Sequence, residues 1–454
     1  MRSRPRVFYG WWVVAAGFAV TFTGFGAAYS FSTFIGSLQA DFAASRGAVS
    51  LVFSLAGFIY FGLGIVTGPL ADRWGSRRLT FLGMLLTGTG LIAASAARSL
   101  TEIYAAYGLG VGCGIGCSYV PAVGAVQRWF ARRRGLASGL AVSGIGVGTL
   151  AVPPLAAALI AALGWRGAYL TLGVLALLFG GGMALLIEND PRERGLAPDG
   201  DPPDGDPRDG DPPDAAPAPP GGAAGTPLRP LLEPPGTAPA RPQRATAART
   251  RHDAPGTPLR QALRSRPFIA LYAAGLICSC GTFVPFVHVV PSAVDRGVPL
   301  SAAVALLSVI GVGSTAGRFL LGGLADRLGR QRSLTVMFLG MAGALTVWAF
   351  AGDFWWLAGF AFAYGVFYGG WVAVLPTVVM DHFGGRHISG IIGALYTSVA
   401  FGTLIGPAAA GFVYDVRHSY TIPILASAAV NLVAAGILAG ATRRERRAPP
   451  AAAG

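Results

Sequence analysis

Long apolar segments alternate with short polar ones along most of the chain. A helix needs about 20 mainly apolar residues to cross the hydrocarbon core of a bilayer. Six segments of that kind lie at 11–36, 48–70, 79–97, 102–127, 136–161 and 166–187. Six more lie at 267–292, 302–323, 333–351, 354–380, 389–411 and 420–441. The pattern predicts an all-α membrane protein with twelve transmembrane helices in two six-helix bundles.

The middle of the chain has a different composition and separates the two bundles. Residues 199–214 alternate Asp with Pro and Gly, and a stretch rich in Pro, Ala and Arg follows. Such a segment buries too little apolar surface to offset its chain entropy, and its aspartates lack the regular spacing of a calcium site. We therefore predict an N-terminal bundle at 1–187, a disordered cytoplasmic linker at 188–265, a C-terminal bundle at 266–442 and a cytoplasmic tail at 443–454.

Composition supports lipid as the solvent for most of the surface. Of the 454 residues, 53% are hydrophobic and only 12% are charged, whereas a soluble chain usually carries about 25% charged residues. The net charge is +14, and all 35 basic residues are arginine. No compact basic domain with interleaved aromatic residues is present, so we expect no nucleic-acid partner.

The arginines are distributed unequally between the two sides of the predicted bundles. The loops on one side, together with both termini, hold 18 arginines. The loops on the other side hold only Arg46, Arg98, Arg166, Arg296 and Arg417. Because cytoplasmic loops carry the excess of positive residues, both termini and the linker are predicted to lie in the cytoplasm, with the chain in the cytoplasmic (inner) membrane.

Two sequence matches at one offset indicate an internal repeat. Residues 68–78 read GPLADRWGSRR, and residues 322–332, which lie 254 positions later, read GGLADRLGRQR. At the same offset, 148–153 and 402–407 share Gly-Thr-Leu followed by Pro. Duplicated six-helix halves predict pseudo-symmetry, with a solute site between the halves at mid-membrane and the halves rocking around it.

The repeated loops resemble the signature that the major facilitator superfamily carries between helices 2 and 3 and again between helices 8 and 9. Gly68 is expected to permit close helix packing. Asp72 can pair with nearby arginines or with a helix N-terminus, which would form a cytoplasmic latch that breaks as the halves move. The predicted gating residues are Gly68, Asp72, Arg73, Arg77, Arg78, Asp326 and Arg327.

A narrower resemblance is to the monocarboxylate-porter and oxalate/formate-antiporter branch of that superfamily. The motifs that carry it are YGWW at 9–12, AYSF at 28–31, DFAASRGAVSLVFSL at 41–55, and Val290-Pro291 before Asp295 and Gly297. The resemblance implies alternating access and a small organic anion as the solute.

Arg318 is the one arginine outside the loops, the termini and the linker. An arginine within a span costs at least about 2.5–3.5 kcal/mol on insertion, and such residues usually mark a substrate path. The middle of each predicted span lacks Asp and Glu, so a substrate carboxylate, held by the planar guanidinium fork, would be its partner. Alternatively, Arg318 lies close enough to the cytoplasmic end to extend toward it, since Asp326 is only two turns away.

The resemblance supports the first reading, because these porters carry an anion-binding Arg in helix 8. Many eukaryotic members place an Asp four residues earlier, where this chain has Ser314. Serine can hydrogen-bond a substrate but cannot hold a proton. Oxalate carriers pair the arginine with a lysine in helix 11, and the absence of lysine from this chain favours a monoanion over a dianion.

His288 is the only histidine well inside a predicted span, and it has two interpretations. Its pKa near 6.5 would let it exchange protons, and it resembles a histidine at this place in bacterial monocarboxylate porters. In this reading it is the proton acceptor, with Asp295 nearer the outer end. The alternative is a structural histidine that is held by hydrogen bonds.

Tyrosines in several predicted spans could form the wall of the pocket. Tyr364 and Tyr368 share a helix face because they are four residues apart, and tyrosines in these helices line the pocket in the porters that this chain resembles. The candidates are Tyr119, Tyr364, Tyr368, Tyr396 and, less strongly, Tyr29. Any of them could instead be a packing residue or belong to the aromatic belt.

The sequence therefore predicts a secondary active transporter of small monocarboxylates such as lactate or pyruvate, with proton symport and exchange both open. The alternatives are an oxalate/formate-like exchanger and a proton-driven exporter of drugs or metabolites. An enzyme is not expected, because the chain lacks HExxH, GxSxG and P-loop motifs. The expected partners are a small organic anion, protons and the lipid bilayer, with no metal, no cofactor and a monomeric state.

Overall fold

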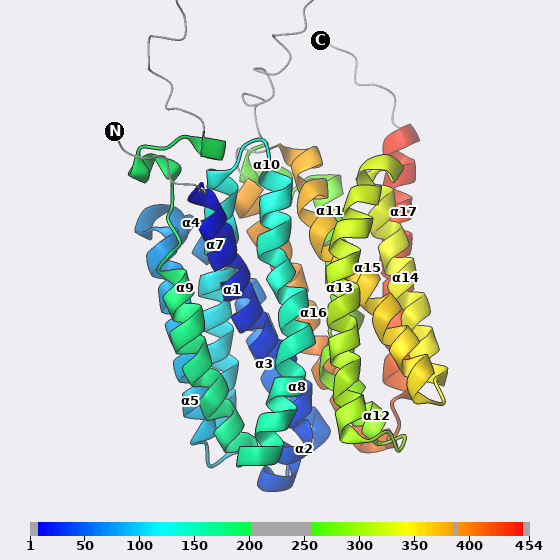
Figure 1. Cartoon of the computed structure of the whole chain (residues 1–454). Coiled ribbons are helices and arrows are strands. Elements are labelled where there is room, and N and C mark those ends of the chain that lie inside the picture. The colour runs from blue at the N-terminus through cyan, green and yellow to red at the C-terminus, as the bar shows by residue number, and fades with distance from the viewer. Residues whose placement is uncertain (1–7, 201–256, 385–387, 448–454) are drawn as a thin grey trace, which may run out of the picture.

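The computed structural model describes residues 8–200, 257–384 and 388–447 and shows a bundle of helices in two halves, placed side by side in Figure 1. The N-terminal half comprises α1 (Gly10–Tyr29), α2 (Phe31–Phe42), α3 (Arg46–Gly62), α4 (Gly64–Trp74), α5 (Ser76–Ser95), α6 (Leu100–Ile103), η1 (Tyr104–Val111), α7 (Gly112–Trp129), α8 (Arg134–Leu175), η2 (Ala176–Gly181), α9 (Gly182–Ala184), η3 (Pro191–Arg194) and η4 (Pro198–Gly200). The C-terminal half comprises α10 (Leu259–Leu263), α11 (Arg266–Thr282), α12 (Val284–Val294), α13 (Leu300–Leu328), α14 (Arg330–Phe350), α15 (Phe354–Phe383), α16 (Ile388–Arg417) and α17 (Thr421–Arg447).

These helices cross the bundle twelve times, as predicted. By length and composition, ten described helical segments can span a membrane, and the pair α3–α4, bent by 48°, makes an eleventh. One of the ten runs over Arg134–Ala184, and its 51 residues far exceed the length that one crossing requires. Gly164 divides it with φ 71° and ψ 169°, which glycine adopts readily. Figure 1 shows the chain running down α8 and returning upward to α9, so this region supplies two spans.

The bundle has two ends. We call the end at which α1 begins and α17 ends the terminal end, at the top of Figure 1. The opposite end, where α2 and α12 finish, is the far end. The sequence-based assignment of the terminal end to the cytoplasm remains a prediction.

The predicted linker, 188–265, is described only at its two ends. The segment from Glu188 to Gly200 folds against the N-terminal half, where the carboxylate of Asp199 accepts hydrogen bonds from the backbone N–H groups of Ala131 and Arg132 at 3.0 and 2.7 Å. The bulk of the segment predicted to be disordered, 201–256, lies outside the described residues, as does the end of the predicted tail, 448–454.

Three of the spans are broken near the middle of the bundle. The first span breaks at Ser30, whose hydroxyl donates to the Ala27 carbonyl at 2.8 Å, a local contact that bends helices. The second breaks at Leu63. The seventh breaks at Phe283, two residues before Pro285, because proline cannot donate the backbone hydrogen bond of a continuous helix. Of the three, only the break between α3 and α4 bends its span by more than 40°.

Two close contacts between the halves are related by the 254-residue repeat found in the sequence. In one of them, Gly57 of α3 faces Thr403 of α16 closely enough that an added Cβ would collide with it. In the other, a Cβ on Gly311 of α13 would lie 2.5 Å from the backbone nitrogen of Leu150 in α8. Gly311 is 254 positions after Gly57, and Leu150 follows Thr149, which is 254 positions before Thr403. Small residues therefore let the halves approach in a pseudo-symmetric way.

Candidate functional site

Arg318 lies in the interior of the bundle, as one of the two sequence interpretations requires. It is only 6% exposed, and the ten residues that follow it in α13 correspond to about 15 Å of helix before the terminal end. Its Nη1 donates to the backbone carbonyl of Val142 in α8 at 2.7 Å, so it contacts the other half. The side chain therefore crosses the interface between the halves.

Two of the guanidinium nitrogens of Arg318 lack a hydrogen-bond partner among the described residues. These are the buried Nε and Nη2. The N–H groups of Nε and Nη2 point in the same direction and form one edge of the guanidinium fork, which matches the two oxygens of a carboxylate. One turn earlier in α13, the hydroxyl of Ser314 is also buried without a partner in the described part of the chain. The arrangement leaves a bidentate anion-binding edge unoccupied by protein.

Beside Arg318, a small cavity of about 20 Å³ lies between the halves. The phenols of Tyr29, Tyr119, Tyr368 and Tyr396 lie close enough to the guanidinium to interact with it electrostatically. The cavity is lined by Phe25, Tyr29, Phe61, Tyr119, Ile145, Phe283, Tyr368, Trp371, Val372, Leu375, Tyr396 and Val399. Four of the five predicted tyrosines are thus brought together around Arg318.

Tyr364 is the predicted tyrosine that the structure places elsewhere. Its hydroxyl donates to the carbonyl of Thr282, at the break between α11 and α12, and it is absent from the lining of the cavity. Tyr368, on the same helix face, donates to or accepts from Tyr29 instead. The shared helix face was predicted correctly, but the two phenols bind different partners. The break in the seventh span exposes the Thr282 carbonyl to Tyr364, whereas Tyr368 faces Tyr29.

Sequence reasoning missed several residues of the cavity. Trp371 in α15 lines it, and the indole Nε1 is buried without a hydrogen-bond partner among the described residues. Tyr60 in α3 lies outside the lining, but its buried ring packs edge-on against Phe25, which belongs to the lining. Nothing in the sequence pattern distinguishes these aromatic residues from the many that pack in the core, so their role could be found only from the fold.

His288 is fully buried in α12 and hydrogen-bonded at both ring nitrogens. The Nε2 atom lies 2.8 Å from the carbonyl of Pro407, and Nδ1 lies 3.1 Å from the hydroxyl of Tyr420. A carbonyl only accepts, so Nε2 carries the proton, and Nδ1 accepts from Tyr420 in the neutral ring. This geometry fits the structural interpretation and is compatible with proton uptake at Nδ1 once Tyr420 moves away.

Asp295, the other predicted proton group, does not contact His288. Both of its oxygens accept from the guanidinium of Arg46, at 2.5 and 2.8 Å. Arg46 also donates to the hydroxyl of Tyr420 at 3.1 Å. The two predicted proton groups are therefore linked through Arg46 and Tyr420.

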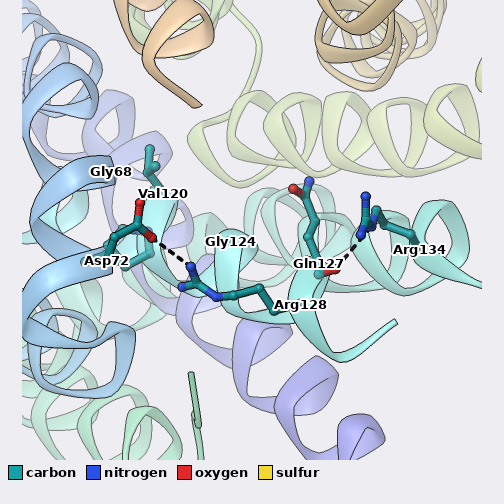
Figure 2. Close-up of a pocket in the computed structure, with 9 residues that line it drawn as sticks. Gly68, Asp72, Val120, Gly124, Gln127, Arg128 and Arg134 are labelled. Carbon is teal, nitrogen blue, oxygen red and sulfur yellow. Dashed lines mark hydrogen bonds and ion pairs between the residues drawn. The ribbon is translucent and has the colours of Figure 1, made fainter. Parts of the chain in front are cut away.

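The predicted gating loop joins elements of the N-terminal half at the terminal end. Figure 2 shows Asp72 and Arg128 directed toward each other, with an ion pair of 2.7 Å between α4 and α7. Arg77 pairs with Glu188 at 2.9 Å, whereas Arg73, Arg78 and Arg327 are exposed. The side chain of Asp326 lies outside what the structure describes.

In the C-terminal half, an ion pair also joins two helices at the terminal end. Arg330 at the start of α14 binds Asp381 near the end of α15 at 2.6 Å. Both this pair and Asp72–Arg128 lie within one half, so the predicted latch role of these loops stays a prediction.

Gly68 does not sit at a close helix contact, contrary to expectation. A Cβ there would meet only Val120, at 3.8 Å, which is an ordinary van der Waals distance. Gly68 instead lines an open pocket of about 180 Å³ at the terminal end, together with Ala71, Asp72, Val120, Pro121, Gly124, Gln127, Arg128 and Arg134. Figure 2 shows this pocket, in which the Nε of Arg134 donates to the Gln127 carbonyl at 3.1 Å. The glycine therefore keeps an opening free of side chain.

Comparison with known sequences gives matches over nearly the whole chain. Residues 16–386 and 308–454 match the family model of the Major Facilitator Superfamily. Monocarboxylate transporter 12-B of Danio rerio is 30% identical over 420 residues, which cover 91% of this chain and 83% of that protein. Monocarboxylate transporter 3 of Rattus norvegicus is 31% identical over 446 residues, which cover 96% and 80%.

Among solved structures, a similar fold is found in the crystal structure of a bacterial homologue of the human lysosomal transporter Spinster, in an inward-facing and unoccupied conformation. The TM-score is 0.68, with 14% sequence identity, and the match covers 98% of this chain and 99% of that one. At this identity the likeness concerns the fold alone.

Proposed function

The chain belongs to the major facilitator superfamily, with its sequence likeness in the monocarboxylate-transporter branch, and from this premise we propose that it is a secondary active transporter of small monocarboxylates. It would work by alternating access, with the solute held between the two halves. The observation that carries the proposal is the unoccupied edge of the buried guanidinium of Arg318.

The energetics of Arg318 favour an anionic solute. An uncompensated charge in a protein interior costs about 3–5 kcal/mol. A substrate carboxylate that bridges Nε and Nη2 would offset this cost through two charge-assisted hydrogen bonds. Because Nη1 is held by Val142, one edge remains for one carboxylate. This supports a monoanion rather than a dicarboxylate such as oxalate.

The lining of the cavity supports a short solute with a polar group near the carboxylate. The phenols and the Trp371 indole supply donors, whereas Phe25, Phe61 and Phe283 supply apolar walls. A volume of about 20 Å³ holds roughly one water molecule, so the site must widen even for a three-carbon acid. A bulky drug would require far greater rearrangement, which makes the exporter alternative less favourable.

Proton symport is the coupling that we propose, with His288 as the proton acceptor. His288 lies two residues after Phe286, whose ring stacks on Tyr29 at 4.3 Å, so its helix contacts the wall of the cavity. Ser314 cannot carry a proton, and the cavity lining contains no carboxylate among the described residues. A neutral His288 would bind a proton when Tyr420 withdraws and would release it when the present hydrogen bonds form again.

We place the protein in the cytoplasmic membrane as a non-enzymatic monomeric carrier, with the terminal end facing the cytoplasm. The arginine excess at the terminal end supports this orientation.

Counterflow in liposomes tests the proposal. Purified protein would be reconstituted with internal unlabelled lactate, and entry of labelled lactate, pyruvate, propionate, formate and oxalate would be measured with and without a pH gradient. We expect counterflow of lactate and pyruvate, its loss in Arg318→Gln, and acceleration of net uptake by an acidic exterior. Equal transport by Arg318→Gln would contradict the proposal. Oxalate–formate exchange without lactate transport would favour the exchanger, and efflux of a hydrophobic dye alone would favour the exporter.

A further inference from the structure

Arg46 joins the two halves at the far end. It is the first residue of α3, in the N-terminal half, and the side chains that it contacts belong to the C-terminal half. Its guanidinium binds both oxygens of Asp295, donates to the hydroxyl of Tyr420 at 3.1 Å and lies 4.1 Å from the centre of the Tyr414 ring. The Arg46 side chain is only 16% exposed, so these interactions are less screened by water than those of a surface ion pair.

The backbone around Arg46 is held by the same half. The carboxylate of Asp415 in α16 accepts from the backbone N–H groups of Arg46 and Gly47, each at 2.9 Å. An acid at this position satisfies the free donors of a helix start and complements its dipole. A Cβ on Gly411 would lie 2.7 Å from the Cα of Gly47. The N-terminus of α3 is therefore seated directly on α16.

The two ends of the bundle differ in how the halves are connected. Of the ion pairs between described residues, only Arg46–Asp295 joins one half to the other, whereas Asp72–Arg128 and Arg330–Asp381 remain within one half. At the terminal end, residues of the N-terminal half line the open pocket of about 180 Å³. This asymmetry is what a carrier closed at the far end requires.

We propose that Arg46 and Asp295 form the latch that holds the far end of the transport path closed, with Asp415 as the cap that fixes Arg46 in place. Opening the far end would separate α3 from α12 and α16, and therefore would break the ion pair and the cap together. The proposal rests on the carrier function proposed above but not on the identity of the solute.

The latch also connects to the interior. Arg46 donates to the hydroxyl of Tyr420, this hydroxyl donates to Nδ1 of His288, and Nε2 of His288 donates to the carbonyl of Pro407. Each donor in this series has one acceptor. When Arg46 moves away, the Tyr420 hydroxyl loses one of its two hydrogen bonds and can turn. His288 would therefore lose its Tyr420 partner at Nδ1 only when the far end opens.

Cysteine accessibility in purified protein tests the latch without any assumption about orientation or substrate. The four native cysteines would be replaced by alanine. Ser32→Cys would report on opening of the path from the far end, because Ser32 is buried in α2, on the far-end side of the break at Ser30, and its hydroxyl donates to the Val287 carbonyl of the other half at 2.7 Å. Val120→Cys would report on the open pocket at the terminal end. The probe is a water-soluble maleimide, and the measured quantity is the rate of labelling.

We expect Asp295→Asn to raise the labelling rate at the Ser32 reporter by about threefold or more, as loss of a partly exposed ion pair allows, and to lower the rate at the Val120 reporter. The opposite changes identify a shift between two states, since general loosening would raise both rates. Asp295→Glu should keep the parental rates, because it retains the carboxylate.

The matched control is Asp41→Asn. Asp41 forms a 2.5 Å ion pair with Arg166 that stays within the N-terminal half, so both labelling rates should remain at the parental values. The latch is overturned if Asp295→Asn labels like the parent, or if Asp41→Asn produces the same opposite changes. Because labelling needs no solute, a failure of monocarboxylate counterflow would leave this result unaffected.

Discussion

Tyr29 and Tyr368 share a hydrogen bond of 2.9 Å between their hydroxyls, although 339 positions separate them in the chain. The bond joins α1 in one half to α15 in the other, beside the guanidinium of Arg318. Both phenols line the cavity, so a solute bound there would contact them. The pair is therefore both part of the site and a connection between the halves.

Because Tyr29 and Tyr368 share one hydrogen bond, we expect the effects of substituting them on the half-saturating lactate concentration to be non-additive. Tyr29→Phe and Tyr368→Phe each remove the same hydrogen bond, worth about 0.5–1.5 kcal/mol, so each should change the half-saturating lactate concentration in counterflow by about two- to tenfold. The double variant should match the larger single effect, since the two substitutions share one interaction. Effects that multiply would show that the two hydroxyls act separately.

Arg318→Lys should reduce lactate counterflow by more than about tenfold, because charged hydrogen bonds contribute about 1.5–3 kcal/mol each and an ammonium cannot present the two-pronged edge. The measurement is the initial rate at saturating and limiting lactate.

Arg318→Met provides a complementary measurement on the same residue. Removing an uncompensated buried charge should raise the thermal midpoint of the empty protein, as replacement of buried charges by apolar residues often does. Lactate should raise the midpoint of the parent but not of Arg318→Met. A lower midpoint in the empty variant would mean that the guanidinium is already compensated.

Trp371 should set the preference for a polar group on the second carbon of the solute. Its indole Nε1–H has no partner among the described residues and lines the cavity. Trp371→Phe removes this donor and keeps an aromatic ring, so lactate and pyruvate should lose about two- to tenfold in apparent affinity, the value of one hydrogen bond. Propionate, which lacks the group, should be unaffected. An equal loss for all three acids would indicate that Trp371 only packs.

The twelve spans and Arg318 could be predicted because their signals are local. Each span is a run of apolar residues, and Arg318 is the lone charge within one. The sequence could not show which of Tyr364 and Tyr368 lines the cavity, because this depends on where the seventh span breaks. The carbonyl of Thr282, next to the break, accepts a hydrogen bond from the hydroxyl of Tyr364. That contact is between residues 82 positions apart, and helix periodicity does not encode it.

Arg46 illustrates the same limit. In the sequence it is one of the few arginines on the side opposite the termini, which identifies it as a loop residue. The structure makes it the first residue of α3, bound to a carboxylate 249 positions away. Charge counting placed it at the correct end but could not identify its partner, because the pairing follows from how the two halves meet.

The ion pair of the predicted gating loop should influence transport more than stability. Asp72 and Arg128 are 60% and 34% exposed at the side chain, and exposed pairs contribute about 0–1 kcal/mol to folding. Asp72→Asn should therefore leave the thermal midpoint nearly unchanged while it slows counterflow several-fold. A second variant is Asp381→Asn, which removes the ion pair with Arg330 at the same end of the C-terminal half and should act in the same direction. Unchanged counterflow in both variants would contradict the predicted gating role of Asp72.

His288→Gln separates proton coupling from solute movement. Glutamine can still donate from its amide to the Pro407 carbonyl and accept from Tyr420, so the hydrogen bonds of His288 can persist, but it cannot bind a proton. If His288 carries the coupled proton, the variant should retain lactate exchange between equal pH values and lose the acceleration of net uptake by an acidic exterior. Tyr420→Phe serves as the comparison: it removes the hydroxyl that occupies Nδ1 but keeps the titratable ring, so net uptake should still respond to external pH. A His288→Gln protein that remains driven by the pH gradient would restrict His288 to its structural role, and the proton would then have to move with the solute as the neutral acid.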